Sequence, residues 1–489
     1  MVESDLSRSD IPWNRHVDTV VIGGGGAGMA AALSAAEVDP DGDVLLLQKI
    51  GGLGGSTSMA VGSFTAAGTE LQAENGIEDS VEHHFQDLDK FLSKYEKGAG
   101  RGFYLDFDGE IWEKDNLELR RLLVENAPET LEWMRGWGCE YAGPYPEGFN
   151  RVPRMHNITP DTEAYADVLG DALEEQGVEI LFNTEAYELV PADGEIAGVL
   201  AQKSGRRNAL QIEARRGVVL AAGDYINNED LRAEFTSNSS ADPINEHNTG
   251  DGHEMAREVG AELVNMDVQY LSLRFGSPLW TGPEVPDMVD HGAIIVNARG
   301  ERFLNETVDY DQLFTSLTRQ PNQVMYLVFD DEIAEVFTEW PHPVSTFSAK
   351  GWGYIDDYRE YSVLSEAESQ AALAERTGFD EEVFAETVTQ YNEAADRSRV
   401  DKFGRTDYMA RLDESPFYAL GPVYPFSLIT DGGVAVDEEM RALTLDGDPI
   451  EGLYAAGNVA GDLLLLGHGH HHAWIFMSGR IAGRNAATR

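Results

Sequence analysis

TVVIGGGGAGMAAALSAAEVDPDGDVLLLQK, residues 19–49, decides the fold of this chain. Its pattern predicts a buried strand, a turn of four glycines, an alanine-rich helix and a second buried strand that ends near Gln48. Two parallel strands joined by a helical crossover form a βαβ unit. We therefore expect an α/β protein built around a Rossmann-like domain.

The glycine turn carries the pattern of a dinucleotide site. Gly23, Gly25 and Gly28 match the G-x-G-x-x-G spacing. In this motif the first glycine permits a tight turn, the second lets the backbone approach a pyrophosphate, and the third lets the helix pack on the strand. The N-terminus of the helix then faces the negative charge of the phosphates. Because the motif lies between a strand and a helix of one βαβ unit, it predicts a bound dinucleotide.

The residue expected to hold the adenosine ribose is a glutamine rather than an acid. Gln48, followed by Lys49, stands at the end of the second strand, where an acidic residue is usual. A glutamine can hydrogen-bond a ribose hydroxyl, without the charge of a carboxylate. The chain has one glycine fingerprint, whereas a flavin enzyme that also uses NAD(P)H normally needs a second. We therefore expect bound FAD and a different electron partner.

The charge balance is strongly acidic, with 86 Asp and Glu residues against 36 Lys and Arg and a formal net charge of −50 over 489 residues. Such a surface repels itself in dilute buffer, but at molar salt the Debye length falls to about 3 Å and the repulsion is screened. The balance favours a salt-adapted cytoplasm, as in an extreme halophile, over an ordinary acidic protein. It also argues against nucleic acid and anionic membranes as partners.

The remaining composition fits a packed cytoplasmic enzyme. A single cysteine, Cys139, excludes an intramolecular disulfide framework, and we expect a buried structural thiol there. Residues 1–18 are polar and acidic and lack the apolar region of a signal peptide. No uncharged apolar stretch reaches the length of a membrane helix, about 18 residues. We expect a soluble, cytoplasmic protein with no membrane span.

Changes of pattern along the chain predict three segments. Residues 1–266 begin with the βαβ unit, and residues 430–489 return to a strand followed by a final helix. Between them, residues 267–429 are richer in aromatics and prolines, with two helices expected near the end and a capping box of Ser365 and Glu368 opening the first. The simplest topology is an FAD-binding domain in two parts, interrupted by an α+β capping domain.

Several further segments resemble one known family. They are LLLQKIGGLGGSTSMAVGSFTAAG (45–68), VVLAAGD (218–224), TGDGHEMAREVGAEL (249–263), NARGERFLNET (297–307), TDGGVAVDEEMRAL (430–443), IEGLYAAGNVAG (450–461) and SGRIAG (478–483). In this order they resemble the fumarate reductase/succinate dehydrogenase flavoprotein family, whose members include the 3-ketosteroid dehydrogenases. The resemblance covers nearly the whole chain after residue 17. It implies a GR2-type FAD-binding domain and a mobile capping domain, with the substrate between them.

The resemblance also assigns the FAD-binding residues. They are Gly23, Gly25, Gly26, Ala27, Gly28, Gln48, Lys49, Gly54, Gly55, Ser56, Thr57, Ala186, Ala222, Gly223, Asp251, Gly457 and Asn458. For Ala186 and Asp251 a purely structural place is an equal alternative, because a strand alanine and a helix-starting aspartate need no ligand. Membrane-bound members of the family attach FAD through a histidine at the position of Ser56, so the resemblance implies noncovalent FAD.

The active-site pattern favours the ketosteroid dehydrogenase branch over the fumarate reductases. Fumarate reductases use an arginine proton donor, a substrate histidine and a second arginine at the positions of Tyr310, Ile429 and Leu466. Without such groups a dicarboxylate would be poorly compensated in so acidic a protein. In the ketosteroid dehydrogenases a tyrosine at the place of Tyr310 acts as the base. A half-buried tyrosine bonded to a backbone carbonyl is the structural alternative.

The implied reaction is desaturation of a carbon–carbon bond next to a ketone. The carbonyl acidifies the neighbouring C–H, Tyr310 would remove that proton, and the adjacent carbon would pass hydride to flavin N5. One alternative is reduction of an activated alkene, as in fumarate reductases. Another is a non-catalytic flavoprotein subunit that docks an electron-transfer partner. The substrate would be a small ketone or enone, and the electron acceptor a quinone or an electron-transfer protein.

The stretch LGHGHHHAW, residues 466–474, offers groups that could polarise the carbonyl. The dehydrogenases use a tyrosine, at the position of Leu465 here, together with a backbone N–H. Gly469 can supply that N–H, and His468 or His470 would give the side-chain donor.

The same stretch begins the last helix, whose free N–H groups would face the flavin. His471 and His472 would serve the flavin there through their backbone. A metal held by the histidines at 468, 470 and 472 is an alternative, but the segment has no nearby Cys or carboxylate, so we predict none. Weaker pocket candidates, each more consistent with a structural role, are Arg154, His156, His342, Tyr354, Arg302 and Glu306.

Overall fold

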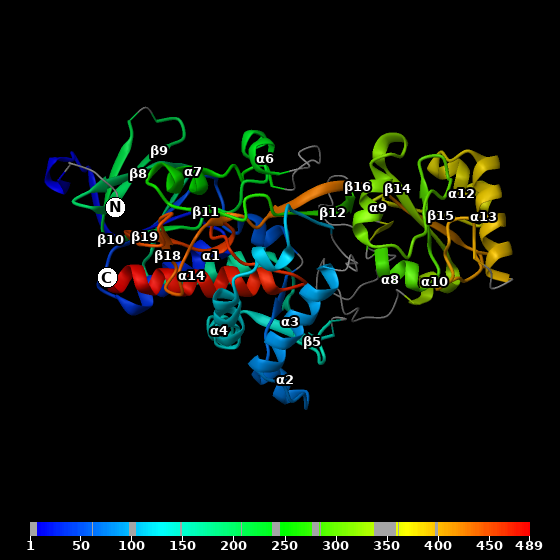
Figure 1. Ribbon diagram of the computed structural model, residues 1–489, viewed down its shortest axis with the longest axis horizontal. Helices are drawn as coiled ribbons and strands as arrows, with labels where there is room; N and C mark the ends of the chain where they lie inside the picture. The colour runs from blue at the N-terminus through cyan, green and yellow to red at the C-terminus, as the bar shows by residue number, and fades with distance from the viewer. Residues whose placement is uncertain are drawn as a thin grey trace.

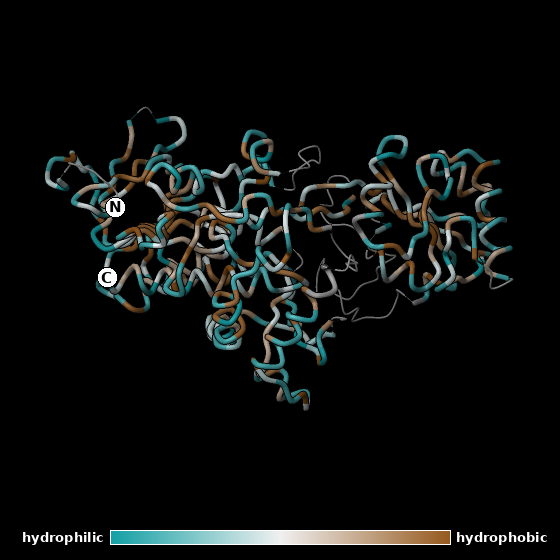
Figure 2. Tube along the Cα trace, viewed as in Figure 1, coloured by the Kyte–Doolittle hydropathy of each residue, from teal (hydrophilic) through white to brown (hydrophobic). Residues whose placement is uncertain are grey.

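The structure is a computed structural model that describes residues 7–60, 62–96, 104–146, 149–206, 208–236, 245–275, 283, 285–336, 358–359, 361–396 and 400–489. Two lobes follow one another along its long axis (Figure 1). Hydrophobic residues concentrate inside both lobes, and hydrophilic residues cover much of the outside (Figure 2). Each lobe therefore has its own core, as the length of the chain leads us to expect.

The central sheet of the first lobe confirms the Rossmann-like fold. Its strand order is β18-β19-β10-β1-β2-β7, and a β8–β9 hairpin extends from β10. The strands are β1 Arg15–Ile22, β2 Val44–Gln48, β7 Glu179–Phe182, β8 Thr184–Ala192, β9 Glu195–Lys203, β10 Leu210–Leu220, β18 Arg441–Leu443 and β19 Pro449–Ala455. β1 pairs in parallel with both β2 and β10. All of β2 is buried, as in a parallel strand covered on both faces.

Two helices pack tightly on each other beside this sheet. They are α1, Gly26–Val38, and α14, His470–Thr488. A Cβ added to Gly479 would lie 2.3 Å from the Ala27 carbonyl oxygen, and one added to Gly483 would lie 2.0 Å from the Ala31 carbonyl oxygen. Glycine alone permits so close an approach, and the contact brings the start of α14 beside the glycine turn that precedes α1.

Further helices and two smaller sheets complete the first lobe. The helices are α2 Glu70–Glu74, α3 Val81–Glu96, α4 Leu117–Gly136, α5 Glu163–Glu175, α6 Glu229–Phe235 and α7 Asp251–Glu258. One sheet has the order β3-β6-β5, with β3 Ser63–Thr65, β6 Met155–Thr159 and β5 Glu140–Tyr145, and the other pairs β11 Leu263–Val264 with β17 Gly433–Val434. Cys139 is buried, and burial raises the pKa of its thiol to about 12, which suits a structural thiol.

The second lobe contains an antiparallel sheet flanked by helices. Its order is β13-β14-β16-β12-β4, and β15 also pairs with β16. The strands are β4 Tyr104–Asp106, β12 Gln269–Phe275, β13 Ile294–Asn297, β14 Met325–Asp330, β15 Leu364–Ala367 and β16 Phe417–Thr430. The helices are α8 Val285–Asp290, α9 Tyr310–Leu317, α10 Asp331–Val336, α12 Gln370–Thr377 and α13 Glu381–Asp396. A strand from the first segment, β4, thus joins this sheet, and the predicted domain limits at 266/267 and 429/430 stay a prediction.

The helix start predicted at Ser365 is wrong. Ser365 lies in β15, where it pairs with Ala419 of β16. The helix begins after Ser369, whose hydroxyl accepts a hydrogen bond from the Ala372 N–H. The strand pairing is non-local, so it overrides the local capping pattern. Within the described ranges, no helix combines the length and apolar character needed to cross a bilayer.

Candidate functional site

A cavity of 510 Å³ lies where the glycine turn, the start of α14 and strands β12 and β16 of the second lobe's sheet meet. Most of the residues predicted to bind FAD line it. They are Gly23, Gly25, Gly26, Ala27, Gln48, Lys49, Gly55, Ser56, Thr57, Ala186, Ala222, Gly223, Asp251, Gly457, Asn458, His471 and His472. Gly28 and Gly54 do not line the cavity: Gly28 packs against the Gly23 carbonyl, and the Gly54 N–H donates a hydrogen bond to the Gly24 carbonyl at 2.9 Å. The two segments of the chain separated by the second lobe thus contribute to one site.

The glycines of the turn fit a bound pyrophosphate. A Cβ added to Gly28 would lie 1.7 Å from the Gly23 carbonyl oxygen, so this position serves close packing. A Cβ added to Gly25 would instead meet nothing nearer than the Gly54 carbonyl oxygen at 3.8 Å. Because Gly25 lines the cavity, that open space is available to a ligand against the backbone. This division of roles is the one that the dinucleotide motif requires.

A second loop closes over the first from the other side. The Thr57 hydroxyl accepts a hydrogen bond from the Gly26 N–H at 3.1 Å, which ties this loop to the first turn of α1. The Ser56 hydroxyl accepts hydrogen bonds from the side-chain amides of Asn245 at 2.8 Å and Asn248 at 3.1 Å. Sequence reasoning missed these two asparagines, although they stand in a polar stretch directly before the glycine-opened helix α7.

Gln48 and Lys49 are anchored at the end of β2. The Gln48 side chain accepts a hydrogen bond from the Gly24 N–H at 3.1 Å and donates one to the Gly52 carbonyl at 2.6 Å. The Lys49 ammonium lies 2.8 Å from an Asp251 carboxylate oxygen and 2.6 Å from the Thr249 hydroxyl. The amide thereby connects the two glycine loops while still lining the cavity. Its contact with a ribose stays a prediction.

The residues predicted to act on the substrate divide into three groups. His468 and Gly469 line the cavity. His470 does not, because its ring is buried against His84, with 2.9 Å between the two Nε2 atoms. The expectation that the His470 side chain faces the substrate is therefore corrected. Tyr310 is the first residue of α9, and its side chain lies outside the described part of the structure, as do His342 and Tyr354.

The histidines at the start of α14 point to separate partners. His472 donates from Nδ1 to the Ser63 carbonyl at 2.7 Å, and burial lowers its pKa to about 4, so its ring is neutral. His470 turns to His84 instead. The rings of His470 and His472 thus bind different partners, which does not favour the alternative of a metal held at 468, 470 and 472. Among the described residues no group of three His, Cys, Asp or Glu has the arrangement of a metal site.

His471 brings its side chain, and not only its backbone, into the cavity. Its Nε2 lies 3.0 Å from Oδ1 of Asp431, whose side chain is buried. The Tyr270 ring, another part of the lining, meets the imidazole edge-on with 5.4 Å between ring centroids. Sequence reasoning missed Asp431, although an acid directly before the paired glycines 432 and 433 was a visible signal.

The wall that the second sheet contributes is largely apolar. It consists of Tyr270, Ser272, Leu273, Phe426, Leu428 and Ile429, and Pro283, which lies outside the sheet, also lines the cavity. Leu466, at the position of a fumarate reductase arginine, is buried in a hydrophobic cluster. Of the described residues that line the cavity, Lys49 is the only lysine or arginine, and Asp251 neutralises it. The described lining therefore has no unpaired lysine or arginine for a substrate carboxylate.

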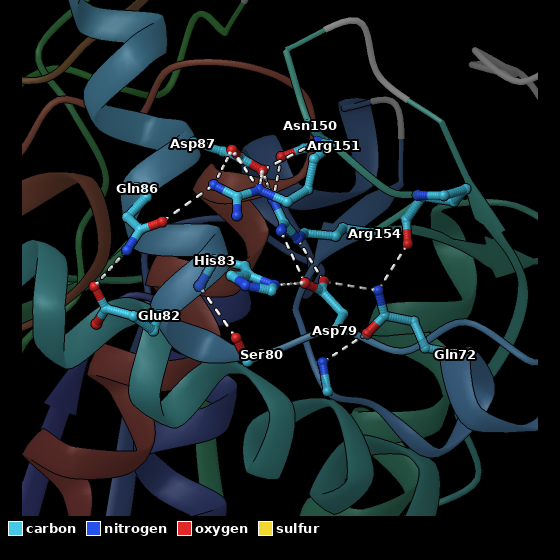
Figure 3. A network of polar contacts seen from close by, with 12 residues as sticks. Gln72, Asp79, Ser80, Glu82, His83, Gln86, Asp87, Asn150, Arg151 and Arg154 are labelled. Carbon is cyan, nitrogen blue, oxygen red and sulfur yellow. Dashed lines mark hydrogen bonds and ion pairs between the residues drawn. The ribbon is translucent and has the colours of Figure 1, made fainter.

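Arg154 and His156, two of the weaker pocket candidates, have structural roles. Arg154 is fully buried and donates to Asp79 and Asp87, as Figure 3 shows. Burial opposes ionisation of Asp87, but hydrogen bonds from Arg151 and Arg154 still hold its pKa well below the usual range. His156 lies within 3.0 Å of the Thr69 hydroxyl, and burial lowers its pKa to about 4. None of these groups lines the cavity.

Arg302 and Glu306 form a buried pair before α9. Two guanidinium nitrogens of Arg302 each lie 2.6 Å from a Glu306 carboxylate oxygen. Arg405 and Asp401 complete this cluster, at 3.2 Å from Glu306 and 2.6 Å from Arg302. The cluster fixes the chain that leads into Tyr310, as expected for a local ion pair.

Comparisons with known proteins agree with this geometry. The FAD binding domain family matches residues 18–472. The chain is 28% identical to the NADH:fumarate oxidoreductase of Klebsiella pneumoniae over 97% of its own length, yet it spans only 48% of that protein. It is 28% identical to the vinyl phenol reductase of Lactiplantibacillus plantarum over 96% of both chains. It is 25% identical to the 3-oxosteroid 1-dehydrogenase of Mycolicibacterium smegmatis over 92% of this chain and 93% of that one.

A solved structure shares the whole architecture. The open conformation of a flavocytochrome c3 fumarate reductase superposes with a TM-score of 0.82 at 27% identity, covering 98% of this chain and 79% of that one. The family match extends over most of the sequence and includes every part of the cavity wall before residue 473. The chain therefore belongs to the FAD binding domain family, and it is an FAD-dependent oxidoreductase related to the fumarate reductases.

Proposed function

We propose that this protein oxidises a CH–CH bond next to the carbonyl of an uncharged ketone. The observation that carries the proposal is the cavity wall described above: apolar side chains from β12 and β16, and a single lysine already paired with Asp251. An uncharged substrate loses little hydration in such a place, whereas a dicarboxylate would lose much without a counter-charge. The electron acceptor in this proposal is a quinone or an electron-transfer protein.

Bound FAD supplies a hydride acceptor, so the chain must orient the substrate and remove one proton. Tyr310 is the proposed base, in line with its counterpart in the ketosteroid dehydrogenases. The Gly469 backbone, which lines the cavity, is the proposed N–H donor to the carbonyl oxygen. Leu428, Ile429 and Phe426 would exclude water from the reacting carbons. We propose noncovalent FAD, because Ser56 stands where membrane-bound relatives have a histidine and its hydroxyl is already bound by Asn245 and Asn248.

A second candidate is reduction of an uncharged activated alkene. It is favoured by the vinyl phenol reductase, which matches over 96% of both chains. The same cavity serves both directions, because the reduction of an alkene is the reverse of the same desaturation. The two candidates differ in which oxidation state of bound FAD the substrate consumes.

Anaerobic mixing of the purified protein with a panel of small molecules separates the candidates. Cyclic ketones and 3-ketosteroids should bleach the oxidised FAD spectrum if the first candidate holds. Uncharged vinyl compounds should restore the oxidised spectrum of reduced FAD if the second holds. Unsaturated dicarboxylates should do neither, and rapid reoxidation by fumarate would contradict the assignment to an uncharged substrate.

Replacing Tyr310 tests the base directly. Tyr310→Phe should retain FAD but slow ketone-driven bleaching by about 10²-fold to 10⁴-fold, the usual contribution of a positioned acid or base. Tyr187→Phe, in an exposed residue of β8, is the matched control and should leave the rate unchanged. Unchanged bleaching in the Tyr310 variant would remove that residue from the mechanism.

A further inference from the structure

The pair His471–Asp431 combines an accessible ring with a buried carboxylate. The His471 side chain is 25% exposed and lines the cavity, whereas the Asp431 side chain is 3% exposed. The 3.0 Å contact joins Nε2 of the ring to Oδ1 of the acid. Among the described residues, the His471 imidazole forms its side-chain hydrogen bond with Asp431. The pair therefore leaves one ring nitrogen, Nδ1, for whatever occupies the cavity.

The carboxylate decides which nitrogen carries a proton. An ionised Asp can only accept hydrogen bonds, so Nε2 must be the donor. A proton on Nδ1 then makes the ring a cation, and a buried carboxylate is the counter-charge that such a cation needs. In this state His471 offers an N–H group to a ligand, and the Asp431 carboxylate balances the positive charge of the ring.

Further residues pack around the pair. Oδ2 of Asp431 lies 3.4 Å from the Leu465 N–H. Asp224 and Tyr225 lie close enough to interact electrostatically with Asp431, and burial raises the pKa of Asp224 to about 6. Tyr270 packs on the imidazole edge-on, and the neutral ring of His472 follows in the helix. The Asp431 hydrogen bond and the Tyr270 contact together orient the ring, as a positioned donor requires.

We propose that His471 is the side-chain donor to the substrate's carbonyl oxygen, and that Asp431 is its positioning residue. This inference rests on the proposed function, because it concerns the oxygen of the same ketone. As the α-proton leaves, negative charge grows on that oxygen, and an N–H donor fixed in advance stabilises it. His471 thereby takes the place predicted for His470, whose ring turns to His84.

A phenolate tests this assignment without turnover. 4-Nitrophenol resembles an enolate, because its ionised oxygen is conjugated with a flat ring, and its colour distinguishes phenolate from phenol. The FAD-loaded protein should bind it as the phenolate, even at pH values where the free dye is protonated. His471→Gln should weaken this binding by about 10-fold to 100-fold, as expected for loss of a hydrogen bond to a charged group, and the bound dye should become colourless.

Asp431→Asn provides a second variant with a different signature. The amide oxygen of asparagine can still accept from Nε2, so the ring keeps its orientation but loses its counter-charge. Dye binding should then be lost at a lower pH than in the unmodified protein, because the cationic ring is less stabilised. A merely structural role for Asp431 would lower affinity equally at every pH.

His16→Gln is the matched control. His16 forms the same kind of pair, 2.6 Å from Glu213, but half of its side chain is exposed on the surface. This variant should bind the dye as the unmodified protein does.

The outcomes separate the two proposals. If no ketone bleaches FAD while dye binding depends on His471, the proposed function fails and the anion-stabilising donor stands. If ketones bleach FAD but dye binding and its pH dependence survive in both variants, the assignment of His471 is overturned. Absence of dye binding to the unmodified FAD-loaded protein would overturn it as well.

Discussion

Within the glycine turn, different residues serve helix packing and ligand binding, and Gly25 is the one that serves binding. Its neighbours Gly23 and Gly28 have no room for a Cβ, whereas a Cβ on Gly25 would enter open space beside the cavity. The space next to Gly25 is therefore reserved for a ligand and is not required by the fold. A larger side chain at this position should displace the pyrophosphate and leave the core intact.

Gly25→Val should therefore fold but bind FAD at least about 10-fold more weakly, since about 1.4 kcal/mol of lost contact already gives that factor. Fluorescence titration of the apoprotein with FAD measures the effect, and far-ultraviolet circular dichroism checks the fold. Gly136→Val is the matched control, because a Cβ there meets no atom within 4 Å, and the residue ends α4 and does not line the cavity. Equal FAD affinity in the two variants would contradict the role given to Gly25.

Single residues also show where sequence reasoning ended. The glycine fingerprint was predictable because its function depends on backbone geometry at consecutive positions. The directions of His470 and His471 were not, since neighbouring residues on a helix project about 100° apart and one of them must leave the cavity. Asp431 lay far from His471 along the chain, and only the fold brings the two side chains together. Pairwise contacts of this kind have no local signature.

At the scale of elements, the contact of α1 with α14 holds the two parts of the FAD-binding fold together. Gly479 and Gly483 on α14 face the alanines of α1, with carbonyl oxygens closer than any side chain would allow. This contact joins residues near the beginning of the chain to those near its end. The close approach also sets the position of the first turn of α14, from which His471 lines the cavity.

Gly483→Leu should destabilise the protein by at least about 1–3 kcal/mol, the usual cost of overpacking a filled core. A backbone carbonyl 2.0 Å from the new Cβ cannot move away as a flexible side chain could, so the upper end of this range is expected. Urea denaturation followed by tryptophan fluorescence measures the loss. Gly136→Leu should cost far less, and similar losses in both variants would show that α14 tolerates a wider spacing.

The elements themselves were predictable to the extent that their signals are local. The strands and helix of the βαβ unit follow directly from alternating buried runs and glycines, and they appear as β1, α1 and β2. β15 and β4 were not foreseen, because each is defined by pairing with a distant strand, β16 or β12. Helices α12 and α13 were expected in the right part of the chain, but the predicted start of the first, Ser365, lies in strand β15 instead.

At the scale of the whole molecule, charge is the dominant property. A net charge of −50 on 489 residues makes the folded state repel itself, because compact charges lie closer together than those of an unfolded chain. The chain has 86 acidic residues but only 36 lysines and arginines. Even if each lysine and arginine paired with one acid, most acidic residues would be left without a cationic partner. Screening should therefore stabilise this fold more than it stabilises a protein near neutrality. A salt-adapted cytoplasm remains our proposal for its setting.

Thermal unfolding at several NaCl concentrations tests this at pH 7.5. Between 0.1 M and 1 M salt the Debye length falls from about 10 Å to about 3 Å, so the unfolding midpoint should rise steadily. Each kcal/mol gained should shift the midpoint by about 2–4 °C in a protein with large domains. The same series at pH 5, close to the isoelectric point near 4.4, is the internal control. Many carboxylates are protonated there and the repulsion is already reduced, so the salt response should shrink. A response of equal size at both pH values would mean that salt acts through hydrophobic burial or specific ion binding, and the excess of acidic residues would then not be what links stability to salt.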